Sequence, residues 1–488
     1  MGVDSYLYAS RFISQLGYRL MAFAIPMTLI DIWTNTLFPV ALLAFITYTT
    51  HFFVLPLVGA KLDTADKLKS ARFLILSKAF FSSAGMLSLF LTFQVGMGGV
   101  PSPSFTTGYF GFFVTSALII AGETVEEAWT LCLERVWVVA LSGGDEDVMG
   151  SYNITLRRID LLCLSAGPLL LGLLLQSMSA PAAQIMLATL GMSLFFALLG
   201  YPEWYLVREA YYRSPALALE RANSTAANGA VGPRKPLASS ATEQVFGAAQ
   251  NALVVLFRSW GKYVRHRVFW ASFSYSMIYF TVLDGGSIMA SFLKWAGIPE
   301  GIIGLTRGVG ALMGLLGSAL FVTVRHLLGT LERTGTTSIW LFWLTLLPVS
   351  VAAGFVNDVT TFGYVVMVCV AAARCSLWLF DLDHTLIMQV YIADGERAEL
   401  NSTQSALYRV FWVLLSVVAM ILSQPQQFRI LALMSLAVVG TSAGVFGLWA
   451  SRQRSHGSEV DEVGMGTPTP PKPAAPAVEA VEETSQAN

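Results

Sequence analysis

Long apolar stretches restrict what this chain can fold into more than any other feature. Twelve of them reach the length needed to cross a bilayer, about 20 apolar helical residues, because each backbone polar group must be satisfied within the segment. Of the 488 residues, 55% are hydrophobic and 12% are charged, against roughly 25% charged in an average soluble domain. The expected crossings are 6–33, 36–58, 71–93, 109–141, 153–176, 182–207, 268–295, 302–328, 336–355, 362–390, 400–422 and 428–450. The sequence therefore predicts an all-α integral membrane protein.

A polar break between the sixth and seventh stretches divides the chain into two groups of six. It predicts an N-terminal lobe at 1–207, a cytoplasmic linker at 208–267, a C-terminal lobe at 268–450 and a disordered tail at 451–488. The last part of the linker is basic and amphipathic, which suits the anionic inner leaflet. The alternative is a positive flank that only sets the topology.

An internal repeat supports the division into two lobes. The fourth-to-fifth connection reads VVALSGGDEDVMGSYNITLRR and the tenth-to-eleventh reads VYIADGERAELNSTQSALYR. Each runs from a helix end through a Gly-acid turn to Asn-x-Thr and then to arginine. Two related halves indicate a major-facilitator-like architecture of twelve transmembrane helices in two six-helix lobes.

The positions of Lys and Arg predict the orientation of the chain. They gather in the loops after the second, sixth and eighth stretches, which places both termini in the cytoplasm. The net charge of −1 gives no global basic field, so we expect the lipid bilayer as partner and no nucleic acid. Whether the membrane belongs to the cell surface or to an organelle stays open.

Ionisable residues lie inside several expected crossings of the first half. Such a side chain at bilayer depth costs about 2.5 to 3.5 kcal/mol on insertion scales, so it normally faces a cavity or a partner. Arg19 lies in the first crossing, Lys78 in the third, and we expect Glu123, Glu126 and Glu127 on one face of the fourth. Together with Arg374 of the tenth crossing, these residues are interpreted as a polar pathway for a cation or a proton. The alternative is that the glutamates only neutralise the basic residues of the first and third crossings.

The tenth crossing, AAARCSLWLFDLDHTLIMQV, carries three further ionisable residues near its centre. Asp381 and His384 are i, i+3 neighbours on one helical face, and Asp383 points away from them. A carboxylate and a neutral imidazole together suit a divalent transition metal. The alternative is that Asp381 pairs with Arg374 and that His384 is a satisfied core residue.

The seventh crossing contains the segment TVLDGGSIM, which supplies candidate ligands to face the tenth. Gly285 and Gly286 weaken the helix and free backbone carbonyls. Asp284 and Ser287 lie beside them. If the seventh and tenth crossings meet, these two side chains join the carboxylate and imidazole above in one metal site.

Four stretches carry a likeness to a known family. They are SRFISQLGYRLMAFAIPMTLID in the first crossing, GAKLDTADKLK after the second, NITLRRIDLL opening the fifth, and SLWLFDL with GERAELNSTQ around the tenth and eleventh. From about Ser10 to about Leu436 the chain resembles the ferroportin family, the iron exporters of solute carrier family 40. The resemblance implies a two-lobed carrier that moves Fe(II), or in some members cobalt, nickel, manganese or zinc, out of the cytosol, with one cation site in each lobe.

Several ligand positions of that family hold other residues here. By resemblance, Tyr18 stands for an aspartate, Ala22 and Leu415 for histidines, Lys78 for a glutamine and Ser287 for a cysteine. Arg19, Arg374 and Asp381 match the family, as do the cytoplasmic charges Arg157, Arg158, Asp160, Glu396 and Arg397. The first-lobe site is therefore expected to be lost, and the second is expected to be rebuilt around Asp381 and His384.

Charged residues on the cytoplasmic side are expected to form a gate. Alternating access needs two closed interfaces of comparable energy, and exposed ion pairs worth under about 1 kcal/mol each bias such a balance. The residues expected to pair across the lobes are Asp63, Arg135, Arg157, Arg158, Glu396 and Arg397.

These features predict a secondary transporter that exports Fe(II) or a related divalent metal, with no cofactor and no enzymatic motif. The main alternative is a transporter of the same fold that carries another cationic or organic solute. A non-transporting receptor or scaffold is a third reading, which the polar residues inside the crossings argue against. The sequence is compatible with a monomer.

Overall fold

Helices make up nearly all of the computed structural model. The structure describes residues 3–62, 66–102, 105, 108–142, 146–178, 180–214 and 259–464. Within these ranges the β-structure is one isolated bridge between Trp33 and Ser102. Eleven of the described helical segments are long and apolar enough to cross a membrane. The predicted all-α membrane class is confirmed.

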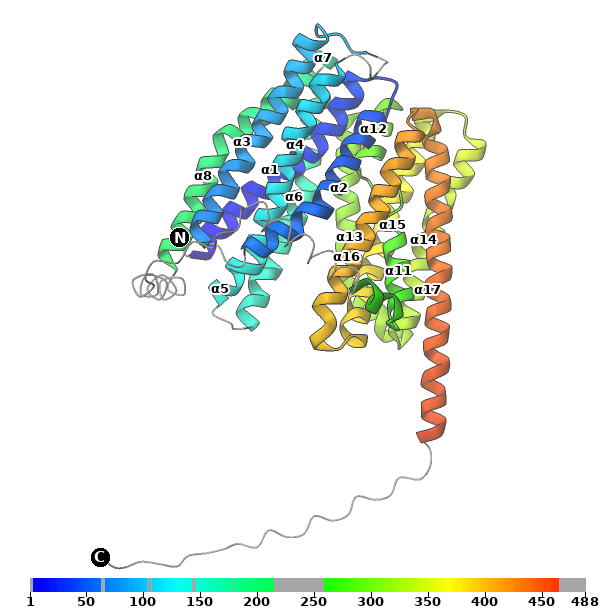
Figure 1. Ribbon diagram of the computed structural model, residues 1–488. Helices are drawn as coiled ribbons and strands as arrows, with labels where there is room; N and C mark the ends of the chain where they lie inside the picture. Colours follow the sequence, from blue (N-terminus) through cyan, green and yellow to red (C-terminus); the bar gives the residue numbers. More distant parts are fainter. Residues whose placement is uncertain are drawn as a thin grey trace, which may run out of the picture.

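The helices form two groups that lie side by side (Figure 1). The first group consists of α1 Val3–Ile32, α2 Phe38–Leu62, α3 Lys67–Leu91, α4 Tyr109–Cys132, α5 Val138–Ser142, α6 Glu146–Gln176, α7 Pro181–Met186 and α8 Met192–Arg213. The second consists of α11 Phe269–Met277, α12 Ser287–Trp295, α13 Glu300–Leu328, α14 Leu331–Phe355, α15 Val359–Tyr391, α16 Asp394–Ile421 and α17 Phe428–Gly464. Short π-helical turns at Thr92–Gly96, Leu133–Trp137 and Leu187–Gly191 extend or join helices of the first group.

The seventh expected crossing is interrupted. Its two helices, α11 and α12, are each nine residues long, and the chain between them is not helical. Gly285 has a φ of 72°, a conformation that costs a residue with a Cβ roughly 1–2 kcal/mol. The Asp284 carboxylate accepts a hydrogen bond from Gly286 N–H at 2.6 Å. Eleven long helices and one broken segment therefore stand where twelve crossings were predicted.

The main contacts between the two groups are those of α6 with α13, α2 with α16 and α1 with α12, and α2 also touches α12. Glycine allows α6 and α13 to approach closely, because a Cβ on Gly304 would lie 2.3 Å from the carbonyl oxygen of Pro168. This close packing fixes the first lobe against the second along one side of the molecule.

A polar cluster joins the lobes at the end of the bundle opposite the N-terminus. Lys294 at the end of α12 pairs with Asp31 of α1 and lies 3.1 Å from Glu300 of α13. Nearby, Leu37 N–H donates to Ser423 O at 2.7 Å. These contacts hold this end of the interface together.

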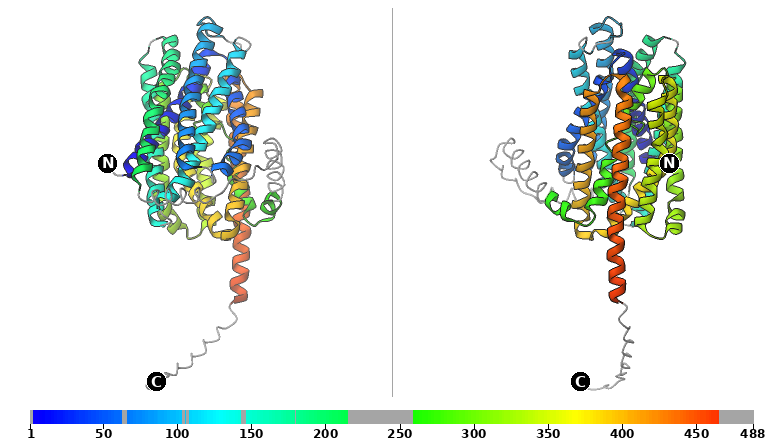
Figure 2. Two further views of the ribbon diagram at one scale, coloured as in Figure 1. Left: turned by 60° about the vertical axis from the view of Figure 1, so that its left-hand side comes forward. Right: turned by 90° about the vertical axis from the view of Figure 1, so that its right-hand side faces the viewer.

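The helices overrun two predicted domain boundaries. α8 continues past residue 207 to Arg213, and α17 continues past 450 to Gly464, extending beyond the rest of the bundle in both views of Figure 2. The start of the predicted tail is therefore helical. Residues 215–258, most of the predicted linker, and 465–488 lie outside the described residues. The described end of the linker packs on the second lobe, where Tyr263 is buried against Ser272.

Candidate substrate cavity

A cavity of about 480 Å³ lies between the two lobes. The first lobe contributes residues of α1, α2, α4 and α6, and the second contributes the α11–α12 break, α13, α15 and α16. Aromatic side chains of Tyr18, Tyr48, Trp378 and Trp412 form part of the wall. The charged lining residues are Arg19, Glu123, Glu127, Asp284, Arg307, Arg374 and Arg409. Most of the expected polar pathway therefore meets in one space.

The three glutamates of α4 do not share one face as the sequence analysis expected. Glu123 and Glu127 line the cavity, and Thr47 Oγ1 donates to Glu123 at 3.4 Å. Glu126 instead turns into the interior of the first lobe, where 4% of it is exposed. A rotation of about 100° per residue separates adjacent helical positions, so Glu126 and Glu127 cannot both face the cavity centre.

Lys78 lies in a closed cage beside the cavity rather than in its wall. Its ammonium is 2.7 Å from Glu203 Oε1, 2.9 Å from Glu126 Oε2 and 2.8 Å from Ser14 Oγ. Lys78, Glu126 and Glu203 are each at most 4% exposed. The alternative, in which a glutamate of α4 neutralises a basic residue of the third crossing, is therefore correct for Lys78 and Glu126. Glu203 is a second partner of Lys78 that the sequence analysis missed.

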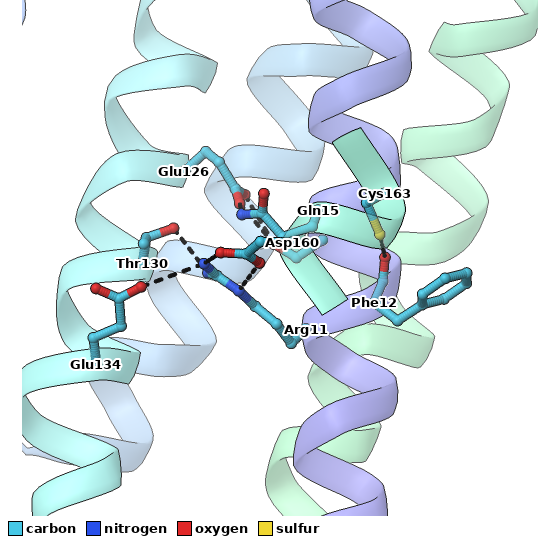
Figure 3. A network of polar contacts seen from close by, with 9 residues as sticks. Arg11, Phe12, Gln15, Glu126, Thr130, Glu134, Asp160 and Cys163 are labelled. Carbon is cyan, nitrogen blue, oxygen red and sulfur yellow. Dashed lines mark hydrogen bonds and ion pairs between the residues drawn. The ribbon is translucent and has the colours of Figure 1, made fainter. Parts of the chain in front are cut away.

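Arg11 forms a second network at the N-terminal end of the first lobe, shown in Figure 3. Its guanidinium donates two hydrogen bonds to Asp160 of α6 at 2.9 and 2.8 Å. It also donates to Thr130 at 3.0 Å and to Glu134 at 3.4 Å, both near the end of α4. This arginine therefore ties α1, α4 and α6 together and is 1% exposed.

On the second-lobe side the cavity is bounded by the broken seventh segment and two arginines. Arg307 of α13 donates to Gly286 O at 3.2 Å. Arg374 of α15 lies against Gly285, with its Nη2 atom 3.5 Å from where a Cβ on that glycine would be. The Asp284 carboxylate interacts electrostatically with both guanidinium groups. Ser287, the first residue of α12, also lines the cavity.

Asp381 lies in an adjoining cavity of about 300 Å³, which also reaches Asp284 and Arg374. Its carboxylate accepts a hydrogen bond from the hydroxyl of Tyr275, so the seventh and tenth segments do meet. His384 lines neither cavity. Its ring is stacked on Tyr275 with the ring centroids 4.1 Å apart, and it is 2% exposed.

The four expected metal ligands therefore do not come together in one site. Asp284 and Ser287 lie in the larger cavity, Asp381 lies in the smaller, and His384 lies behind Tyr275. Across the described part of the chain, no three His, Cys, Asp or Glu side chains come together to hold a metal ion. The ion pair between Asp381 and Arg374, which was the alternative to a metal site, is not formed either, since Asp381 accepts a hydrogen bond from Tyr275.

Asp383 points away from the cavities, as its helical position indicated. It is 0% exposed and neither carboxylate oxygen has a hydrogen-bond partner among the described residues. A Cβ on Gly335 of α14 would lie 2.3 Å from Asp383 Oδ2, so the carboxylate lies against α14.

The expected gate residues do not form cross-lobe ion pairs in the part that the structure describes. Arg157 of α6 reaches the other lobe through a cation–π contact, 5.0 Å from the Trp378 ring centroid, and Arg158 is exposed. Glu396 pairs with Lys262 of its own half at 3.1 Å. Asp63 lies outside the described residues, as do the side chains of Arg135 and Arg397.

Three charged groups of the cavity region were missed by the sequence analysis. They are Arg307, Arg409 and Glu203, each an ionisable residue inside an apolar helix. An ionisable side chain inside an expected crossing is the signal that identified Lys78, and the same signal was present for all three residues.

Comparison with known proteins identifies the family. The family model described as Ferroportin1 (FPN1) matches residues 2–439. The chain belongs to the ferroportin family. It is therefore a membrane transporter and not an enzyme.

Relatives from plants and bacteria match over nearly their whole length. Solute carrier family 40 member 1 of Oryza sativa subsp. japonica is 29% identical over 94% of this chain and 93% of its own length. Ferreportin of Bdellovibrio bacteriovorus is 24% identical over 92% of this chain and 95% of its own.

Solved structures confirm the major-facilitator-like fold. A bacterial homologue of the iron transporter ferroportin in an inward-facing state has a TM-score of 0.73 at 23% identity, over 92% of this chain and 98% of its own. An outward-facing structure of such a homologue has a TM-score of 0.55 at 23% identity, over 92% of this chain and 100% of its own. The nucleoside transporter NupG has a TM-score of 0.57 at 13% identity, over 92% of this chain and 99% of its own length.

Proposed function

We propose that this protein exports a divalent metal ion, with Fe(II) as the leading candidate, from the cytosol by alternating access. The observation that carries the proposal is the arrangement of Glu123 and Glu127 of the first lobe and Asp284 of the second around one cavity. Tyr48 lies within electrostatic range of both Glu123 and Asp284, so the acids of the two lobes flank the same space. Carboxylate oxygens are ligands for hard and borderline divalent ions. The ferroportin relatives support the choice of iron.

The position of the cavity between the lobes supports alternating access. A rocking motion exposes such a cavity to one side at a time. The Lys294 cluster joins the lobes at the end opposite the N-terminus, and the better agreement with an inward-facing homologue fits a cavity reached from the N-terminal end. We place both termini in the cytoplasm, which makes the Lys294 cluster the outer closure. His384 does not line the cavities, so the candidate metal ligands of the second lobe along this route are the carboxylates of Asp284 and Asp381.

Efflux from cells that express single variants tests the proposal. We expect E123Q and E127Q each to lower ⁵⁹Fe or ⁵⁷Co efflux by about tenfold or more, because each removes a charged group that contacts the ion. Glu209→Gln is the matched control, since Glu209 lies outside the cavity wall and pairs with the half-exposed Arg213 at 3.0 Å. Equal efflux of metal by all these variants, or efflux of organic cations in place of metal, contradicts the proposal.

A further inference from the structure

The charges around the central cavity do not favour a bare cation. Four guanidinium groups, those of Arg19, Arg307, Arg374 and Arg409, face three carboxylates in its wall. A divalent ion entering this space alone meets a surplus of positive charge, which raises its energy in a partly desolvated site. The first lobe supplies the two glutamates and one arginine, so the surplus lies on the second lobe.

The arginines of this wall have few hydrogen-bond partners. Arg19 lies over the Tyr18 ring and Arg307 over the Phe23 ring, at 5.1 and 5.2 Å from the ring centroids, and neither contact uses an N–H donor in a hydrogen bond. Arg374 and Arg409 make no hydrogen bond or ion pair with any residue that the structure describes, and Arg19 Nε is buried without a partner. The bond from Arg307 to Gly286 O occupies one of five N–H donors on that guanidinium. Donors removed from bulk water without a partner are costly. Guanidinium groups left open in a transport cavity therefore point to a ligand that accepts their hydrogen bonds.

Three of these arginines form one positive pole. Arg307 lies within electrostatic range of Arg374 and Arg19, and Asp284 is the carboxylate that offsets it. The start of α12, which no side chain caps, lies at Ser287 in the cavity wall and adds the positive end of a helix dipole to the same place. Glu127 interacts with Glu126, Arg409 and Arg19 and forms with Glu123 the acidic side of the cavity. The cavity therefore has a positive pole, formed by Arg307 and Arg374 of the second lobe with Arg19 of the first, and an acid pair on the first lobe.

We propose that the positive pole binds the carboxylate of a small organic acid, so that the metal enters the cavity as a metal–carboxylate complex. Arginine matches a carboxylate with two parallel N–H···O bonds, a geometry that a lone metal ion does not use. The carboxylate then offsets the surplus positive charge, and the metal faces Glu123 and Glu127. The metal half of this inference rests on the proposed function, whereas the carboxylate half rests on the arginines alone.

Binding to the full-length protein in nanodiscs separates the two halves. The probes are citrate alone, Co(II) alone and Co(II)–citrate, measured by calorimetry on wild type and on Arg374→Gln. The matched control is Arg333→Gln, since Arg333 is exposed at the start of α14. We expect Co(II)–citrate to bind wild type and R333Q alike, and R374Q to weaken that binding by about tenfold or more. R374K is expected to recover part of the affinity, because it restores the charge without the fork geometry.

The outcomes decide between the inference and the proposed function. Thermal stability of ligand-free R374Q checks that it folds, and R307Q replaces it if it does not. Co(II) alone binding as tightly as Co(II)–citrate, with no effect of R374Q or R307Q, overturns the inference and leaves the proposed function standing. Citrate binding that depends on Arg374, in a protein that moves no metal in cells, supports the carboxylate half of the inference and overturns the proposed function together with the metal half. Failure of wild type to bind citrate in either form overturns the inference.

Discussion

The Lys78 cage makes a sharp prediction about stability. Lys78→Met keeps the length of the side chain and removes the charge that holds Glu126 and Glu203 at 2.9 and 2.7 Å. Breaking a buried pair from one side costs about 3–5 kcal/mol, because a buried charge loses its partner. In K78M two carboxylates, those of Glu126 and Glu203, lose their ammonium partner together. The Ser14 hydroxyl remains as a neutral donor to Glu126 at 2.8 Å.

This free energy corresponds to a fall of roughly 10²- to 10⁴-fold in the ratio of folded to unfolded protein. We expect K78M to show a clearly lower melting temperature in detergent and lower abundance in cells. Lys69→Met on the same helix is the control, because Lys69 is exposed. The double variant K78M with Glu203→Gln is expected to recover part of the loss, since it leaves one uncompensated carboxylate instead of two. A K78M protein as stable as K69M, or no recovery in the double variant, refutes the reasoning.

Three further predictions concern the interface and the broken segment. Lys294→Met is expected to shift the equilibrium toward outward-open forms by about tenfold or more, because it removes the charge-assisted contact between Lys294 and Asp31 across the lobes. Spin-label distances across the interface measure this shift, and unchanged distances contradict it. His384→Ala is expected to lower thermal stability by about 2–4 kcal/mol while efflux per folded molecule stays near wild type, whereas Asp381→Asn is expected to lower efflux. Loss of efflux in H384A at normal abundance instead supports the metal-ligand hypothesis for that histidine. Gly285→Ala is expected to lose about 1–2 kcal/mol of stability because its φ is 72°, while the matched Gly354→Ala, whose Cβ meets nothing within 4 Å, is expected to be tolerated in the same melting assay.

Local chemistry explains the parts of the fold that could be predicted. Apolar length alone locates the crossings, since lipid offers no hydrogen bonds to the backbone. Gly285 and Gly286 predicted the weak point of the seventh crossing, where the helix is indeed interrupted. Four short motifs predicted the family, which the family model confirms. Each of these signals lies within about 25 consecutive residues, so no knowledge of partners was needed.

The candidate site was predicted only in part for a related reason. The cost of an ionisable group in lipid predicted that Arg19 and Arg374 belong to a polar pathway, and both line the cavity. Helical periodicity could not divide Glu126 from Glu123 and Glu127, because the choice depends on which neighbour each glutamate meets. It also grouped His384 with Asp381, although Tyr275 of another helix separates the imidazole from the cavity.

What the sequence determined by itself is the membrane-spanning character of this protein, its two halves and its family, because these follow from length, hydropathy and short motifs. Only the tertiary structure decided which charges are structural and which face the transport route. Lys78 and Glu203 are 125 positions apart in the chain yet form one buried pair, and this pair keeps the lysine out of the cavity. Electrostatic energy depends on distance in space and on burial, and neither is encoded in the order of residues along a single helix.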